Sequence, residues 1–319
     1  MNRWYYKLSP LLETRNSKSI IHNFEVKGHV GLTINPYQGC QHRCGYCYAT
    51  YEWSPEFYDK IYAKSNAAEV LETQLKSGKY DIHKPVMVSS ATDAYQPAEI
   101  RYGITRRCIE ILQKYKVPYY VFTKSAIIER DLGLHQRYRS DCFLVWSITT
   151  TNERIRRLVE PGTPAASSIF NAIKKFVDAG VCCAVNVDPI LPLITDSPKH
   201  LDEIVTACFD TGVKYVSGAI LRLRHDIWER MKTILKLLNI ENGPDVYKNM
   251  IYRFKDPLKP WFNVSANESY QTEVSQSLEE KVLQKGMRLG FPDLMRSKRL
   301  SSNKNPFTGG QQTLLLNYT

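Results

Sequence analysis

Three cysteines lie close together in the segment NPYQGCQHRCGYCYAT. Cys40, Cys44 and Cys47 have the spacing C-x-x-x-C-x-x-C, and Gly39 and Tyr46 precede the first and the third of them. Three thiolates on one loop can bind three irons of a cubane [4Fe–4S] cluster, which leaves the fourth iron open for another ligand. The motif therefore predicts a metal centre with an open coordination position, the feature that separates a catalytic cluster from a saturated electron-transfer cluster.

A zinc site completed by His42 or by a distant residue is the main alternative. Structural zinc sites usually use paired C-x-x-C arms, and this sequence has no second arm. The spacing therefore favours the iron–sulfur cluster, while zinc stays open. The other cysteines lie in apolar surroundings, where a small buried side chain is the expected role; they are Cys108, Cys142, Cys182, Cys183 and Cys208.

The cysteine loop follows the first of six short apolar runs that predict β-strands, and amphipathic stretches lie between these runs. The predicted strands cover residues 30–34, 85–89, 117–123, 142–148, 181–187 and 213–220. The predicted helices cover residues 66–76, 104–116, 127–138, 169–179, 200–210 and 227–238, because apolar residues recur there at spacings of three and four. Such alternation implies parallel pairing with right-handed crossovers. Six units fit a partial (β/α)6 barrel better than a closed eightfold barrel, and a doubly wound sheet stays open.

The alternation also suggests a division of the chain. Residues 30–241 form the expected α/β barrel domain, residues 1–29 an N-terminal extension and residues 242–319 a C-terminal extension. The 319 residues are 43% hydrophobic, which is typical of a globular protein. The beginning of the sequence does not have the pattern of a signal peptide, and no run is apolar enough for a membrane span. We therefore expect a cytoplasmic protein outside the membrane.

The longer match, INPYQGCQHRCGYCYA followed by SSATDAYQPAE and FTKS, resembles the radical SAM superfamily and, within it, the spore photoproduct lyase-like branch, also labelled DNA repair photolyase-like. The resemblance covers about residues 30–225. It implies a cluster at the carboxyl ends of the barrel strands, with S-adenosylmethionine (SAM) chelated at the open iron. Reductive cleavage of SAM would give methionine and a 5′-deoxyadenosyl radical that abstracts a substrate hydrogen. The resemblance also implies an electron donor such as ferredoxin or flavodoxin.

Polar residues at the ends of the predicted strands are the candidates for SAM contacts. Short hydroxyls and a carboxylate suit the methionine ammonium, a lysine after the third strand suits the carboxylate, and a tyrosine between two cluster cysteines suits the adenine. These candidates are Ser89, Ser90, Thr92, Asp93, Lys124, Ser147, Asn186, Asp188 and Tyr46. Turn formation, helix capping and a solvated surface lysine explain the same residues without a ligand.

Two residues are candidates for contact with the substrate. Tyr48 could reach the active site, although packing within the loop explains it equally well. Ser90 aligns with the position where spore photoproduct lyases carry a hydrogen-donating cysteine, and a serine O–H is a far poorer hydrogen-atom donor than a thiol. Repair of spore photoproduct is therefore not implied for this chain, although Cys182 or Cys183 could replace the missing thiol.

The excess of basic residues raises the question of a nucleic-acid partner. The chain has 43 Lys and Arg against 32 Asp and Glu, a net charge of +11, which favours contact with phosphates. Basic groups interleaved with aromatic rings can bind a nucleic-acid strand, but a solvated basic surface explains them as well. The candidates are Arg154, Arg156, Arg157, Arg222, Arg224, Arg296, Lys298 and Arg299, with Tyr51, Trp53, Phe57, Tyr58 and Tyr62.

Three classes of function therefore remain open. The first is a radical SAM enzyme that acts on nucleic acid. The second is a radical SAM enzyme that acts on a peptide, a protein or a small molecule. The third is a non-catalytic protein that binds an iron–sulfur cluster or zinc.

Overall fold

Six strands of the structure occupy the positions that the sequence predicts. The computed structural model describes residues 10–26, 29–52, 56–255, 257–259 and 262–292. The six strands are β3 (His29–Ile34), β6 (Val86–Val88), β7 (Tyr119–Thr123), β8 (Cys142–Ser147), β9 (Cys182–Ile190) and β10 (Tyr215–Ile220). Neighbours in this series pair in parallel, which confirms the predicted arrangement.

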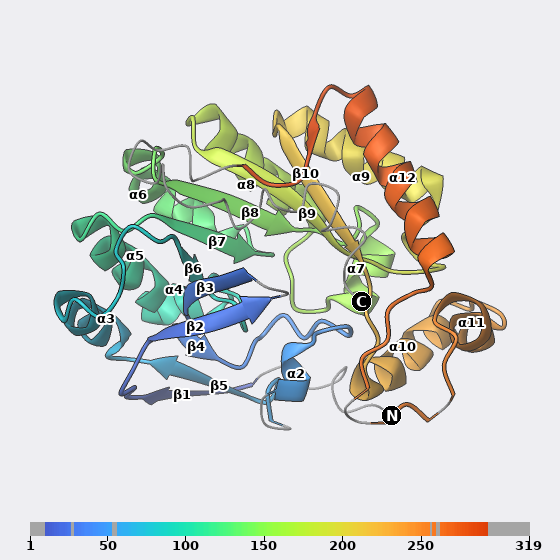
Figure 1. The fold of residues 1–319 in the computed structure, drawn as a ribbon, viewed down its shortest axis with the longest axis horizontal. Helices are drawn as coiled ribbons and strands as arrows, with labels where there is room; N and C mark the ends of the chain where they lie inside the picture. Colours follow the sequence, from blue (N-terminus) through green and yellow to red (C-terminus); the bar gives the residue numbers. More distant parts are fainter. Residues whose placement is uncertain (1–9, 27–28, 53–55, 256, 260–261, 293–319) are drawn as a thin grey trace.

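Two further strands extend this sheet at its edges. Its order is β11-β10-β9-β8-β7-β6-β3-β2, in which β2 (Ile21–Val26) is antiparallel to β3 and β11 (Arg288–Leu289) is parallel to β10. Within the described part of the chain the two edge strands do not pair with each other, so the sheet stays open (Figure 1). The order also lacks the reversal that a doubly wound sheet requires. The partial (β/α)6 barrel is thus confirmed, and the doubly wound alternative is wrong.

The crossovers between the parallel strands contain the predicted helices. These are α3 (Ala67–Lys76), α5 (Ile104–Lys114), α8 (Ala166–Asp178), α9 (Pro198–Thr211) and α10 (His225–Leu237). The stretch 127–138 forms a 3₁₀ turn, η1 (Ile127–Asp131), followed by α6 (Leu132–Arg137). Between β6 and β9 the prediction missed two short helices, α4 (Ala98–Tyr102) and α7 (Glu153–Val159), because stretches this short show no clear apolar period.

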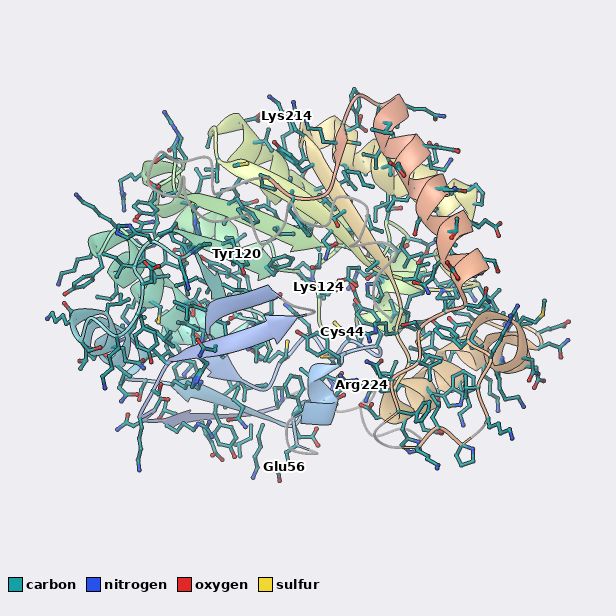
Figure 2. All side chains as sticks on the ribbon, in the orientation of Figure 1. Cys44, Glu56, Tyr120, Lys124, Lys214 and Arg224 are labelled. Carbon is teal, nitrogen blue, oxygen red and sulfur yellow. The ribbon has the colours of Figure 1, made fainter. Side chains whose placement is uncertain are left out.

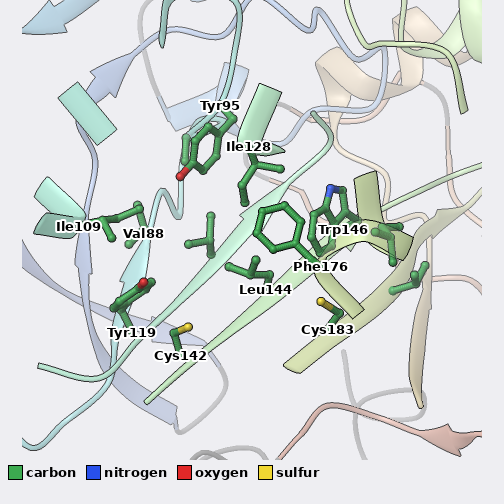
Figure 3. Packing of buried hydrophobic residues seen from close by; sticks show 14 of the residues in the cluster. Val88, Tyr95, Ile109, Tyr119, Ile128, Cys142, Leu144, Trp146, Phe176 and Cys183 are labelled. Carbon is green, nitrogen blue, oxygen red and sulfur yellow. The ribbon is translucent and has the colours of Figure 1, made fainter. Parts of the chain in front are cut away.

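The apolar faces of sheet and helices meet in one large core. Figure 3 shows Leu144 and Trp146 of β8 beside Phe176 of α8, and Ile109 of α5 beside Val88 of β6, all of them fully buried. The rings of Trp146 and Phe176 lie 5.5 Å apart between centroids. This dense packing fixes the strands rigidly, so that the residues at their carboxyl ends keep defined positions.

A second, smaller sheet carries the cysteine loop and was not predicted. It has the order β1-β5-β4, with β1 (Leu11–Arg15), β4 (Tyr37–Gln38) and β5 (Lys60–Lys64). The loop leaves β4, passes through the short helix α2 (Ala49–Glu52) and returns to β5, which is antiparallel to β4. In Figure 1 this sheet lies below the barrel, with α2 beside α10.

The region after β10 adds helices to two sides of the barrel. Helix α10 continues into α11 (Gly243–Val246) and a π-helical turn, η2 (Tyr247–Ile251), while α12 (Glu268–Gln284) packs against α9 and β10. These elements lie partly in the segment 242–319 that the sequence separates as an extension, so that segment contributes a strand and a helix to the barrel itself. No helix in the described ranges is long and apolar enough to cross a membrane.

Candidate metal and cofactor site

The loop with the three cysteines lies against the carboxyl ends of the barrel strands. His42 of the loop contacts Asp93, which follows β6, and the Tyr46 hydroxyl lies 2.9 Å from Thr149 Oγ1, which follows β8. Figure 2 shows Cys44 close to Lys124, the residue directly after β7. The fold therefore brings the predicted metal ligands to the edge where parallel strands present their functional side chains.

The three thiols share one buried cluster of side chains. Cys40 and Cys44 are buried and Cys47 is half-buried, and all three are free thiols. Burial raises the pKa of the Cys40 thiol well above its usual range, and the Asp93 carboxylate raises it further. Burial and Glu160 likewise raise the pKa of Cys44, which the Lys124 ammonium partly offsets. Bound cations are needed to keep such buried thiols ionised.

In the described residues, no three His, Cys, Asp or Glu side chains are grouped as the ligands of a single metal ion would be. A cubane cluster makes no such demand, because each of its cysteines binds a different iron. The free, adjacent thiols of Cys40, Cys44 and Cys47 fit that donor set.

Two glycines allow the cluster loop to fit between its neighbours. Gly39 has φ +81°, and a Cβ there would lie 2.3 Å from the carbonyl oxygen of Lys60. Gly162, in the turn after α7, would place a Cβ 2.1 Å from the carbonyl oxygen of Gln41. Its N–H donates to the carbonyl of His42 and its own carbonyl lies 3.0 Å from His42 Nδ1. The sequence analysis noted Gly39 but missed Gly162.

The TDAYQP segment after β6 holds the same loop from the other side. Gln96 accepts a hydrogen bond from the Gln41 N–H at 3.0 Å and donates one to the Gly39 carbonyl at 3.1 Å. His42 Nε2 lies 3.1 Å from Asp93 Oδ2. Burial alone would lower the pKa of His42, but the Asp93 carboxylate outweighs it and raises that pKa. Gln96 was not among the predicted site residues, although it belongs to the quoted motif.

Asp93 is occupied by protein groups. Its carboxylate accepts hydrogen bonds from Thr123 Oγ1 at 2.7 Å, from the Lys124 N–H at 2.6 Å and from the Tyr95 N–H at 2.8 Å. Burial alone would raise its pKa, but the contact with His42 and these donors lower it. Asp93 therefore ties the loop to the ends of β6 and β7, and its contact with SAM stays a prediction.

Lys124 lies in a compact group of polar side chains at the strand ends. Its ammonium is 3.0 Å from Glu160 Oε1 and 5.4 Å from the centre of the Tyr46 ring. Glu160 also accepts hydrogen bonds from Thr149 Oγ1, at 2.8 Å, and from the Tyr46 hydroxyl. Burial alone would lower the pKa of Lys124, but Glu160 raises it, so the ammonium stays charged. Glu160 escaped the sequence analysis because only tertiary packing brings it to Lys124.

The hydroxyls after β6 include two without a partner. Among the described residues, Ser89 Oγ and Thr92 Oγ1 are buried and make no hydrogen bond. Buried polar atoms are nearly always hydrogen-bonded, so the pair indicates room for a polar ligand. Ser90 Oγ accepts a hydrogen bond from Asn35 Nδ2 at 3.2 Å, and the half-exposed Tyr48 donates through its hydroxyl to the Ser90 carbonyl. Both predicted substrate-contact residues thus meet at one point.

The remaining cofactor candidates face Lys124 in different ways. Asn186 Nδ2 donates to Asp188 Oδ2 at 3.1 Å, and burial raises the pKa of Asp188 against the opposing charge of Lys124. The Lys124 ammonium lies 3.3 Å from the carbonyl of Ser147 and 3.4 Å from that of Asp188. Ser147 therefore contacts the Lys124 ammonium through its backbone carbonyl rather than through the hydroxyl that the sequence suggested.

Several residues proposed for nucleic-acid contact have other roles. Arg156 is buried and donates to the carbonyls of Glu160, at 3.3 Å, and Thr163, at 2.7 Å, so it cannot reach a phosphate. Phe57 and Tyr58 are buried in the cluster of side chains around the cysteines. Both corrections have the same cause, since a sequence pattern does not tell which face of an element is buried. Arg154 and Arg157 are exposed, whereas Arg222 and Arg224 are half-buried.

Other candidates lie outside the described residues or at the wrong end of the barrel. The side chains of Tyr51 and Trp53 and the basic residues of the tail, Arg296, Lys298 and Arg299, belong to the first group. Cys182 and Cys183 begin β9, at the end opposite the cysteine loop, and Figure 3 shows Cys183 inside the apolar core. The expectation that one of them replaces the missing thiol is therefore wrong.

Comparison with known proteins identifies the family of this sequence. The sequence profile of the Radical SAM superfamily matches residues 34–208. An uncharacterized protein of Mycobacterium tuberculosis, Rv2578c, is 32% identical over 201 residues, which are 60% of this chain and 59% of the relative. The uncharacterized protein ORF301 of Acidianus two-tailed virus is 26% identical over 262 residues, 73% of this chain and 83% of the relative.

Solved structures share the fold at low sequence identity. Spore photoproduct lyase complexed with dinucleoside spore photoproduct has a TM-score of 0.66 at 14% identity, covering 87% of this chain and 81% of that chain. A mutant of the lyase with bound AdoMet and the same dinucleoside has a TM-score of 0.64 at 14% identity, over 87% and 80% of the two chains. The matched profile covers more than half of the 319 residues and includes all three loop cysteines, and so this chain belongs to the radical SAM superfamily.

Proposed function

We propose that this enzyme holds a [4Fe–4S] cluster on Cys40, Cys44 and Cys47 and cleaves SAM reductively for hydrogen abstraction. The observation that carries the proposal is the meeting of three free thiols, the Lys124 ammonium and two unpartnered hydroxyls at one edge of the barrel. When bound, the cluster and SAM together supply a 5′-deoxyadenosyl radical and methionine. The protein itself positions both groups and keeps water away.

Different side chains at the strand ends contact different parts of SAM in this proposal. The Ser89 and Thr92 hydroxyls offer hydrogen bonds to the methionine ammonium, and Lys124 offers its charge to the carboxylate. Tyr46, held by Glu160 and Thr149, offers a ring face beside the adenine. We assign further polar contacts with SAM to Asp93, to Ser90 and to the groups around Lys124, namely Ser147, Asn186 and Asp188.

Tyr48 and Ser90 are assigned to the substrate side of the site. The half-exposed Tyr48 ring lies over the backbone of Ser90, where an incoming substrate would meet both. Because no thiol occupies this position, the enzyme needs another source for any hydrogen returned to its product. We also propose that residues 30–241 carry the catalytic site of the barrel and that the protein works in the reducing cytoplasm, with ferredoxin or flavodoxin as its electron donor.

Anaerobic reconstitution with iron, sulfide, a reductant and SAM tests the reaction. The native chain is expected to bind close to four irons and to release 5′-deoxyadenosine. A triple variant with Ala at the three loop cysteines is the matched control and is expected to release none. Stoichiometric zinc in place of iron, with no nucleoside released, would replace the proposal with the non-catalytic zinc protein.

For the substrate we propose a polyanion, with nucleic acid as the first candidate. Support comes from the net charge of +11 and from the exposed Arg154 and Arg157 beside the strand ends. Spore photoproduct lyase, which shares the fold, is itself known in complex with a dinucleoside spore photoproduct. Binding to duplex DNA should weaken with salt by a log–log slope of about −0.9 for each phosphate contacted.

A double variant with Gln at Arg154 and Arg157 should flatten that slope by about two contacts. A double variant with Gln at Lys174 and Lys175, which are exposed on α8, removes the same number of positive charges. This control should reduce the slope less. If neither DNA nor RNA binds, while a peptide or small molecule exchanges deuterium with SAM, the alternative substrate class replaces this one.

A further inference from the structure

We infer that Arg230 sets the reduction potential of the cluster by holding one fixed positive charge against the backbone of the cysteine loop. The inference rests on the proposed function, and it adds a positioning residue from a helix outside the eight-stranded sheet. Arg230 lies on α10, far from the cysteines in sequence, and nothing in the C-x-x-x-C-x-x-C motif calls for it.

The guanidinium is bonded to the loop at several points. Arg230 Nε donates to the Gly45 carbonyl at 2.6 Å, and Nη2 donates to the Cys47 carbonyl at 3.2 Å. Nη2 also donates to Thr50 Oγ1 at 3.0 Å, and the same hydroxyl donates to the Cys47 carbonyl at 2.8 Å. The charge is therefore held at the carbonyls on both sides of Tyr46, between the second and third cluster cysteines.

Asp226, one turn earlier on α10, orients the guanidinium. Its Oδ2 lies 2.9 Å from Arg230 Nη2 and 2.5 Å from Thr50 Oγ1. Arg230 is 8% exposed, and a buried charge is costly unless it is paired and hydrogen-bonded. The apolar residues of α10 already hold the helix in place, among them the buried Trp228 and Met231. Helix packing alone therefore gives no reason for a buried arginine at this position.

Two other cations near the cysteines are, like Arg230, paired with carboxylates, and they donate to carbonyls in other parts of the chain. Lys124 is paired with Glu160 at 3.0 Å. Arg43 donates to the Tyr58 carbonyl at 2.8 Å and lies 3.7 Å from Asp59 Oδ1. Arg230, in contrast, donates directly to two carbonyl groups within the span from Cys44 to Cys47.

The physical effect has a definite sign. Reduction takes the cluster from [4Fe–4S]²⁺ to [4Fe–4S]⁺ with one electron from a low-potential donor, so the reduced form carries one more negative charge. A fixed positive charge nearby stabilises the reduced form, and net charge and hydrogen bonding are the levers by which a protein sets such potentials. Asp226 acts in the opposite sense on the same centre.

Potentiometric titration of the reconstituted full-length protein, followed by electron paramagnetic resonance, measures this effect directly. With Arg230→Gln, the ratio of reduced to oxidised cluster at a given potential should fall roughly tenfold, a downward shift of about 59 mV for one electron. Arg230→Lys keeps the charge and should shift the midpoint much less. Asp226→Asn removes the opposing charge and should shift it upward. Lys174→Gln removes one exposed charge on α8 and should leave it unchanged.

The outcomes separate this inference from the proposed function. A native chain that binds no [4Fe–4S] cluster overturns both. A loaded native cluster whose midpoint is unchanged in Arg230→Gln overturns the charge effect alone. Equal shifts in Arg230→Gln and Arg230→Lys, or a downward shift in Asp226→Asn, would show that the arginine acts only by shaping the loop. If Arg230→Gln fails to fold, Asp226→Asn decides, because the charge effect requires an upward shift of its midpoint potential.

Discussion

The eight cysteines of this protein occupy two regions with opposite surroundings. The five outside the loop follow the apolar layers of the barrel, where Cys108, Cys142, Cys183 and Cys208 are buried and Cys182 is half-buried. The three of the loop lie beside charged groups, with Glu160 and Lys124 near Cys44 and Asp93 near Cys40. The same side chain therefore packs in an apolar core in one region, whereas in the other it lies among charged groups at the predicted metal site.

The largest expected effect comes from removing thiols in each region. Cys44→Ala should abolish cluster binding and SAM cleavage, because it leaves two protein ligands for a cluster that needs three. Cys142→Ala, in the core, should keep the full iron content and cost about 1–2 kcal/mol of unfolding free energy, since only one small buried group is lost. Iron analysis and thermal unfolding measure the two effects. Equal iron loss in both variants would contradict the division into two regions.

The close packing of Gly162 against the cysteine loop gives the next largest expected effect on stability. Gly162→Ala places a Cβ against the backbone carbonyl of Gln41, so we expect a loss of about 3 kcal/mol in stability, the upper end for overpacking, together with poor iron retention. Gly133→Ala is the matched control, because a Cβ there meets nothing within 4 Å. Iron loss in the control as well would show that the loop is not specifically sensitive at Gly162.

The buried His135, in the apolar region, should control the stability of the protein in acid. Burial lowers the pKa of His135 to about 4, from 6.5, while Asp131 opposes the shift. The ring contacts the hydroxyls of Tyr95 at 3.0 Å and Tyr119 at 3.1 Å. Between pH 6.5 and 4 the unfolded chain binds a proton that the folded chain does not, so stability is full above pH 6.5 and falls as the pH drops.

The lowered pKa of His135 corresponds to a loss of about 3 kcal/mol in unfolding free energy at pH 4. Chemical denaturation of the native chain and of His135→Gln at several pH values measures it. The variant should be less stable at pH 8 and should lose less on acidification than the native chain. Parallel pH profiles of the two proteins would exclude His135 as the acid-sensitive group.

The smallest expected effect concerns Lys124, in the charged region around the cysteines, and the affinity for SAM. Lys124→Ala should weaken SAM binding by about 1–3 kcal/mol, the scale of one lost charge-assisted hydrogen bond. Because this change strands the Glu160 carboxylate, a double variant, Lys124→Ala with Glu160→Gln, separates binding from folding. Lys114→Ala, at an exposed surface pair, should leave the affinity unaltered. Native affinity in a folded, cluster-loaded Lys124 variant would exclude the predicted contact.

The sequence by itself determined the six alternating units and the parallel fold and predicted a candidate ligand set, because these depend on spacing and apolar period within short stretches. It missed β1, β4 and β5, short strands whose pairing partners lie elsewhere in the chain. It also assigned Arg156 to the surface, although that side chain is buried against Thr163.

Only the tertiary structure decided what surrounds the cysteines. Glu160 meets Tyr46 across 114 residues of sequence, and Arg230 meets Gly45 across 185. Such contacts exist because α7 and α10 are packed at the carboxyl ends of the strands, and no local pattern records which distant helix will face a loop. The motif therefore predicts the metal ligands, whereas the charged groups that surround these cysteines come from the packing of the fold.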